Sequence, residues 1–143
     1  MRKIARYIYV GLAWSELASV IVPFFLAGMA LFVGRTHWSV HVGFGYWAGL
    51  PLLALIVVGL IGWIPRRLTA WLVGMVVLHF VHISLPGLKD DLPIVAAFHP
   101  VTALLLTWVT YKHARIATQL LLEPRRGSEN MEQPVQVEPS TQQ

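Results

Sequence analysis

Apolar residues fill the chain in four long runs that short polar breaks separate. The runs cover residues 7–33, 42–64, 68–85 and a fourth that begins near 94. The breaks fall at Arg35, His37 and Ser39, at 65–67, and at 86–93. A bilayer core about 30 Å thick requires about 20 helical residues, and backbone polar groups in lipid must be bonded within the segment. The pattern therefore predicts four membrane-spanning helices.

The bounds of the fourth helix are open between two alternatives. It begins near Ile94 and ends at 111–115, or it begins at Pro100 with His99 as its cap and extends toward Leu122. Proline suits the first turn of a helix, which favours the second alternative. In the first run, Pro23 removes one backbone hydrogen bond and predicts a kink.

Composition supports the membrane assignment. The chain has 143 residues, of which 56% are hydrophobic and 13% are charged, against about 25% charged in an ordinary soluble domain. Cysteine is absent, which excludes disulfides, iron–sulfur clusters and covalently attached c-type haem. The first run is too long for a cleaved signal peptide and contains Glu16, so we expect it to stay as a helix.

The basic residues set the expected orientation. Nine lie on one side of the predicted spans and two, Arg35 and Lys89, on the other. The positive-inside rule then predicts an all-α, up-down four-helix bundle with both termini in the cytoplasm. The domains expected are a cytoplasmic N-terminus (1–6), the membrane domain (7–122) and a disordered cytoplasmic tail (123–143). The bilayer explains the net charge of +4, so no nucleic-acid partner is needed.

Histidines are the first candidate site. Five of the six fall toward the outer face, on or before three different spans: His37, His41, His79, His82 and His99. Neutral imidazole ligates haem iron, and bundle cores commonly hold cofactors. We expect haem b between His41 and His99, because the second and fourth helices of such bundles are often diagonal. His79 or His82 is the substitute ligand.

Other residues complete this hypothesis. Gly45 lies one turn from His41 and would let a flat ring approach, while Arg35 and Lys89 could meet the propionates. Two alternatives stay open: the histidines are interfacial polar residues, or His37 and His41 belong to a zinc or copper site. His113 lies at the cytoplasmic end, and Tyr9 is expected to be an interfacial aromatic anchor.

Glu16 is the second candidate site. It lies about 14 Å into the first helix, where an acidic residue costs about 3 kcal/mol on insertion scales. The functional interpretations are a proton relay, a cation-binding group or a partner to a cofactor. The alternative is a neutral carboxylic acid that is hydrogen-bonded across helices.

Three short motifs carry a resemblance. Phe25-Leu26-Ala27-Gly28 with Phe32, His41-x-x-x-Gly45, and His99-Pro100-Val101-Thr102-Ala103-Leu104 resemble an uncharacterised family of small four-helix bacterial membrane proteins, domain of unknown function 6220. The resemblance covers roughly residues 2–115 and implies a fold and a cytoplasmic-membrane location, with no established activity. The two histidine motifs are also similar to b561-type cytochromes, which implies haem b on His41 and His99.

Three functions follow as hypotheses. The first is electron transfer through one outer haem b, to or from quinone or a redox protein. The second is a non-catalytic membrane subunit or scaffold, a role in which the chain could assemble as an oligomer. The third is a small proton-coupled transporter that uses Glu16, because small multidrug transporters also have four short helices and a carboxylate in the first. Whether the chain is an enzyme stays open.

Overall fold

The computed structural model describes residues 3–62 and 64–122, and every regular element in them is helical. The elements are α1 (Lys3–Phe32), α2 (His37–Trp47), α3 (Leu50–Gly62), α4 (Arg66–Ser84), the 3₁₀ turn η1 (Leu85–Leu88), α5 (Pro93–Ala96) and α6 (His99–Leu122). The predicted tail, 123–143, lies outside the described residues.

Four stretches of the described chain are long and apolar enough to cross a membrane. They are Ile4–Phe32, His37–Ile61, Arg66–Leu88 and Pro93–Leu122. Only 17–22% of each span's apolar window is buried inside the molecule, so most of its apolar surface faces outward, as expected for helices that lipid surrounds. The prediction of an all-α, four-helix membrane bundle is confirmed.

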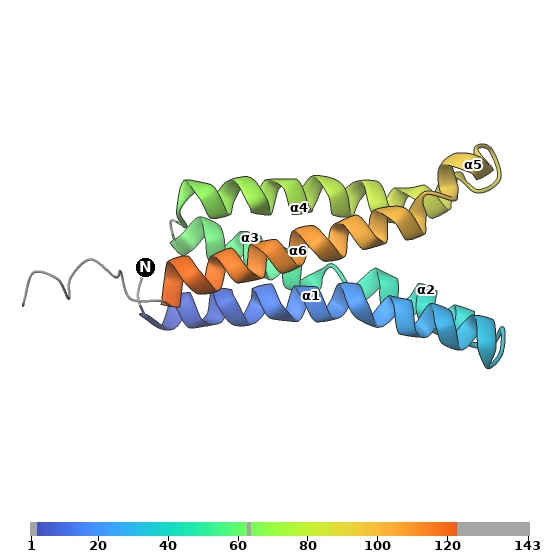
Figure 1. Cartoon of the computed structure of the whole chain (residues 1–143), viewed down its shortest axis with the longest axis horizontal. Coiled ribbons are helices and arrows are strands. Elements are labelled where there is room, and N and C mark those ends of the chain that lie inside the picture. Colours follow the sequence, from blue (N-terminus) through green and yellow to red (C-terminus); the bar gives the residue numbers. More distant parts are fainter. Residues whose placement is uncertain (1–2, 63, 123–143) are drawn as a thin grey trace, which may run out of the picture.

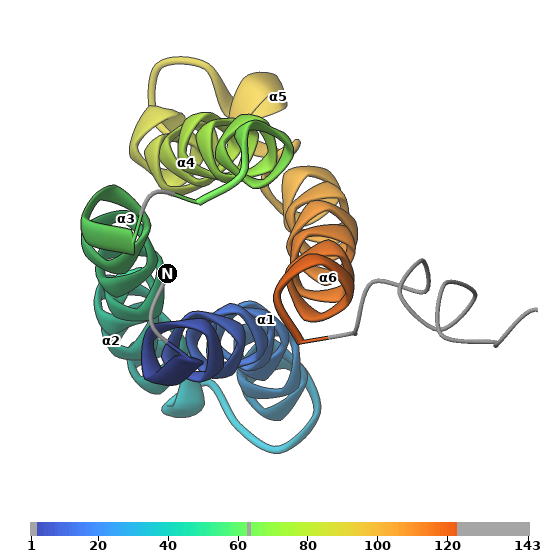
Figure 2. The same cartoon turned by 90° about the vertical axis from the view of Figure 1, so that its left-hand side faces the viewer.

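The four spans form a bundle in which each lies beside its sequence neighbours (Figure 1). Seen from one end, α1, the α2–α3 pair, α4 and α6 occupy four corners, and α6 is diagonal to the α2–α3 pair (Figure 2). Helix α1 packs against α2, α3 and α6, and α4 packs against α6. We call the end that carries Arg6, Arg66 and Arg115 the basic end, and the opposite end, with η1 and α5, the histidine end.

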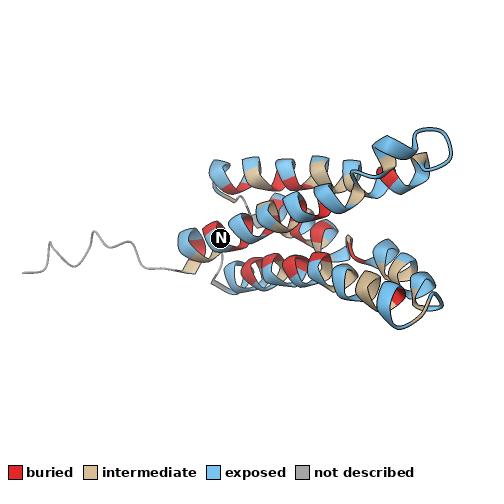
Figure 3. Ribbon diagram, turned by 45° about the vertical axis from the view of Figure 1, so that its right-hand side comes forward, coloured by how far each residue is buried: buried red, intermediate tan, exposed pale blue. Residues whose placement is uncertain are grey.

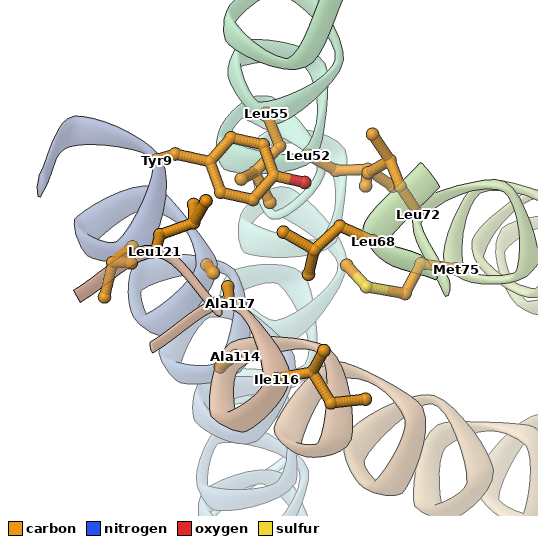
Figure 4. Packing of buried hydrophobic residues seen from close by; sticks show 12 residues of the cluster. Tyr9, Leu52, Leu55, Leu68, Leu72, Met75, Ala114, Ile116, Ala117 and Leu121 are labelled. Carbon is orange, nitrogen blue, oxygen red and sulfur yellow. The ribbon is translucent and has the colours of Figure 1, made fainter. Parts of the chain in front are cut away.

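The buried core lies in the half of the bundle next to the basic end. Its cluster includes Tyr9, Leu55, Leu68 and Met75, all fully buried, and their side chains meet between α1, α3, α4 and α6 (Figure 4). Toward the histidine end, buried residues become sparse (Figure 3), and α2 contains none. The bundle is therefore packed tightly in one half and loosely in the other.

The second span is broken where the sequence predicts one helix. Helix α2 ends at Trp47 and α3 starts at Leu50. Proline has no backbone N–H, so Pro51 cannot donate to the carbonyl one turn before it, and a break falls at Ala48 and Gly49. The fourth span follows the second alternative, because α6 runs from His99 to Leu122 after the separate short helix α5.

Candidate functional site

Glu16 lies inside the bundle and faces His79. Its side chain is fully buried, and its Oε1 lies 3.6 Å from Nδ1 of His79 on α4. That distance is slightly long for a direct hydrogen bond. Neither atom has another hydrogen-bond partner among the described residues. Because burying an unpaired carboxyl group is costly, Glu16 and His79 depend on each other.

The break in the second span lies against this pair. The Ser19 hydroxyl is 2.8 Å from the carbonyl oxygen of Ala48, in the break, and 3.4 Å from Oε2 of Glu16. The backbone of Leu52, in the first turn of α3, also interacts with the Glu16 carboxyl group. The start of a helix carries unpaired N–H groups and the positive end of the helix dipole. Glu16 therefore faces backbone that a continuous helix would have hidden.

Gly49 makes room for the imidazole of His79. A Cβ atom at position 49 would lie 3.0 Å from Nε2 of His79, closer than such atoms pack. The hydrogen on Gly49 thus allows the ring to lie against the break in the second span. Gly45, one turn earlier, has no such role. It is exposed, and a Cβ there would meet nothing within 4 Å.

His82 and His99 form a second cluster at the histidine end. Their rings stack, with centroids 4.0 Å apart and planes inclined by 13°. Nδ1 of His99 donates to the carbonyl oxygen of His82, at 3.0 Å. The Thr102 hydroxyl donates to the carbonyl oxygen of His99 and so accepts from Nδ1 of His82, at 3.0 Å. This closed set of bonds ties the end of α4 to the start of α6.

His41 is held elsewhere, beside α1. Its Nδ1 donates to the carbonyl oxygen of Pro23, at 2.9 Å, and its ring stacks on Trp38 with centroids 5.0 Å apart. The structure thus brings His99 onto His82, whereas His41 lies against α1. In neutral rings, donation from Nδ1 leaves Nε2 of His41, His82 and His99 as a free lone pair.

Four of the five outer histidines, His41, His79, His82 and His99, still lie in the half of the bundle next to the histidine end. Within residues 3–62 and 64–122, however, no three histidine or acidic side chains converge closely enough to hold a metal ion. Arg35 is exposed near Trp38, on the rim of a shallow hollow, and Lys89 is exposed and pairs with Asp90 at the other side of the histidine end.

A buried polar pair escaped the sequence analysis. Tyr9 and His113, expected at the membrane interface and the cytoplasmic end, are both fully buried. The Tyr9 hydroxyl lies 3.1 Å from Nε2 of His113. One signal was present in the sequence: Tyr9 and Glu16 are seven residues apart, which places them on one face of a helix.

Comparison with known proteins gives one match. Residues 23–85 match a family of unknown function, DUF6220. The matched region contains the Phe25–Gly28 and His41–Gly45 motifs, whereas His99 and Pro100 lie beyond it. Curated proteins and solved structures give no match. Over less than half of its length, the chain is therefore similar to an uncharacterised family, and its helices are those of a multi-pass membrane protein.

Proposed function

We propose that the protein carries protons across a bacterial cytoplasmic membrane, with Glu16 and His79 sharing the transported proton. The observation that carries this proposal is the buried contact of 3.6 Å between Oε1 of Glu16 and Nδ1 of His79. Both atoms lack other partners among the described residues. Ionisable residues inside a membrane usually mark a pathway for ions or protons.

The chemistry of the pair suits a single proton. A carboxylate beside an imidazolium and a carboxylic acid beside an imidazole carry the same net charge. The proton can therefore move between the two groups without changing the charge buried in the bundle, which lowers the cost of the transfer. Adding a proton to the pair, or removing one, changes that charge by one. The exchange of protons between the pair and either side of the membrane is therefore the more costly step.

The histidine end supplies an approach to the pair. His79 and His82 are three residues apart on α4, on the same side of the helix, and His82 stacks on His99 at the start of α6. Imidazoles both accept and donate protons near neutral pH. In this proposal, His99 and His82 pass protons between the outer surface and His79.

Replacing Glu16 tests the proposal. We expect the purified protein, in vesicles of phosphatidylethanolamine and phosphatidylglycerol, to carry protons when a potassium gradient with valinomycin sets a membrane potential. A pH-sensitive dye inside the vesicles measures the flux. Glu16→Gln, which keeps the size of the side chain but cannot ionise, should lower the flux about 100-fold, as expected for loss of a proton-transfer group.

The matched control is Ser15→Ala, which changes the exposed neighbour of Glu16 and should keep the wild-type flux. The assay is repeated with sodium and with a lipophilic cation in the buffer, because a coupled transporter requires its substrate. Equal flux in wild type and Glu16→Gln, or no wild-type flux under any of these conditions, would contradict the proposal. A protein that carries nothing but co-purifies with a partner would favour a scaffold.

Haem b with electron transfer is a second proposal, supported by one feature. His41, His82 and His99 each donate from Nδ1 and leave Nε2 free, and ligating histidines are oriented in this way. For this proposal His41 and His99 are the ligand pair, because the rings of His82 and His99, stacked at 4.0 Å, leave no space for a macrocycle between those two. Quinone or a redox protein would then be the electron partner.

An absorption spectrum tests the haem proposal. The protein is expressed with a haem precursor, purified in detergent and recorded before and after dithionite. Haem ligation by two histidines should give a Soret band that shifts on reduction, and His99→Ala should abolish it, whereas His37→Ala should not. A colourless protein that also fails to take up added haem would exclude the proposal.

A further inference from the structure

Tyr9 and His113 meet in the core between the helices, in the tightly packed half of the bundle next to the basic end. They come from α1 and α6, both are fully buried, and their hydroxyl and Nε2 atoms lie 3.1 Å apart. The Tyr9 ring extends from α1 toward Leu55 and Leu68 (Figure 4). The ring also lies against α3 at Gly59, where a Cβ would lie 3.5 Å from Cε2 of Tyr9. The pair therefore lies where apolar side chains would be expected.

The hydrogen bond between Tyr9 and His113 leaves one polar atom of the pair without a partner. Nδ1 of His113 is buried and has no hydrogen-bond partner among the described residues. The buried cluster around the pair includes the apolar side chains of Ala114, Ala117 and Leu72, and the buried Thr110 hydroxyl donates to its own helix, to the carbonyl oxygen of Leu106. A phenylalanine and a leucine would fill such a site without a buried unpaired nitrogen, which is unfavourable. The polar pair therefore calls for a reason other than packing.

The position of the pair supplies one. Tyr9 and Glu16 lie on the same face of α1, two turns and about 10 Å apart. On α6, His113 is 14 residues beyond His99, which is about 21 Å further toward the basic end. Ionisable side chains thus occur at three depths in the bundle: the partly buried His82 with His99, then the fully buried Glu16 with the partly buried His79, then the fully buried His113 with Tyr9.

We propose that Tyr9 and His113 relay protons between the Glu16–His79 pair and the basic end of the bundle. This inference rests on the proposed function and adds the route that protons take between the Glu16–His79 pair and the basic end. A proton that binds Nδ1 of His113 makes an imidazolium, which gives its other proton, on Nε2, to the Tyr9 oxygen. The hydroxyl proton of Tyr9 passes on along α1 to the Glu16 carboxylate, which takes it up as a carboxylic acid. One proton enters and one leaves, and rotation of the neutral groups restores the starting state.

The charged groups near this route lie outside the core. Arg6 on α1, Arg66 and Arg67 on α4, and Lys112 and Arg115 on α6 are all exposed. Helix α3 contributes no titratable side chain in its described residues. Tyr9 and His113 are therefore the proton-exchanging groups that face the interior at this depth, with Glu16 the next one along α1.

Two conservative substitutions test the relay in the same vesicle assay. His113→Gln keeps a side chain that can bond to Tyr9 but cannot bind a proton, and should lower the flux about ten-fold or more. Tyr9→Phe removes only the hydroxyl group and should also lower the flux. The matched controls are His37→Gln and Tyr111→Phe, which alter an imidazole and a hydroxyl outside the route and should keep wild-type flux.

Two readouts separate a relay from a packing role. In His113→Ala, imidazole added to the buffer should restore part of the flux, and the restored flux should depend on pH because the added ring must bind and release the proton. The infrared band of the Glu16 carboxyl group should still respond to pH in His113→Gln and Tyr9→Phe, because protons still reach it from the histidine end. Comparable thermal unfolding of the variants and their controls shows that they fold.

The outcomes distinguish the two proposals. Wild-type flux in His113→Gln or in Tyr9→Phe, with Glu16→Gln inactive, would overturn the relay and leave the Glu16–His79 site standing. Should His113→Gln fail to fold, Tyr9→Phe decides by itself. Absence of any Glu16-dependent flux in the wild-type protein would overturn the proposed function and the relay together.

Discussion

At the scale of single residues, the identity of a side chain in this bundle depends on what lies opposite it. Glu16 is tolerated because Nδ1 of His79 lies 3.6 Å from its Oε1. His79 in turn fits because Gly49 has no Cβ at the point where Nε2 approaches. Three residues on three spans therefore form one unit, and a change at any of them reaches the carboxyl group.

Gly49→Ala tests this dependence. The added methyl group would lie 3.0 Å from Nε2 of His79, so the imidazole must move away from Glu16. We expect the free energy of unfolding to fall by about 1–3 kcal/mol, as for overpacked cores. Equilibrium unfolding in mixed micelles measures the change.

The control is Gly74→Ala on α4, where a Cβ would meet nothing within 4 Å. Alanine is the better helix former by about 1 kcal/mol, so this variant should be as stable as the wild type or more so. If Gly49→Ala behaves like Gly74→Ala, His79 does not lie where it is described.

At the scale of elements, the second span differs most from a plain membrane helix. Its hydropathy is that of one helix, and its length, His37–Ile61, is enough to cross the bilayer. The break at Ala48 and Gly49 divides it into two pieces with different surroundings. Helix α3 contributes Leu52 and Leu55 to the core, whereas α2 contributes no buried residue.

This difference predicts unequal stability along one span. Local opening is easiest where few side chains are buried, so amides of α2 should exchange hydrogen faster than those in the basic half of α4. There Leu68, Leu72 and Met75 are buried. Hydrogen exchange by mass spectrometry in lipid nanodiscs measures both segments in one sample. Equal protection of the two would show that the histidine half is packed as tightly as the basic half.

At the scale of the whole molecule, polarity is distributed along the bundle axis. The basic half holds the apolar core around Tyr9 and His113, and the histidine half holds the stacked rings of His82 and His99. Glu16 lies in the first span between these two clusters. A core that is closed at one end and loose at the other lets a buried group exchange with one side more readily than with the other.

The sequence by itself determined the class of fold. Runs of apolar residues long enough for a bilayer require helices, since lipid offers no partner to a free backbone group. Glu16 and the clustered histidines also stood out in the sequence, because lipid excludes such residues unless something offsets their cost. These conclusions depend on hydropathy and length, which are properties of segments and do not require knowledge of their neighbours.

The partners of those residues were decided only by the tertiary structure. Hydropathy does not fix the rotation of a helix about its axis, so it cannot show that His99 stacks on His82 while His41 bonds to Pro23. It also placed Tyr9 at the membrane interface and His113 at the cytoplasmic end, although both lie in the core. A side chain's depth follows from its position along one helix, but its contacts depend on how several helices pack together.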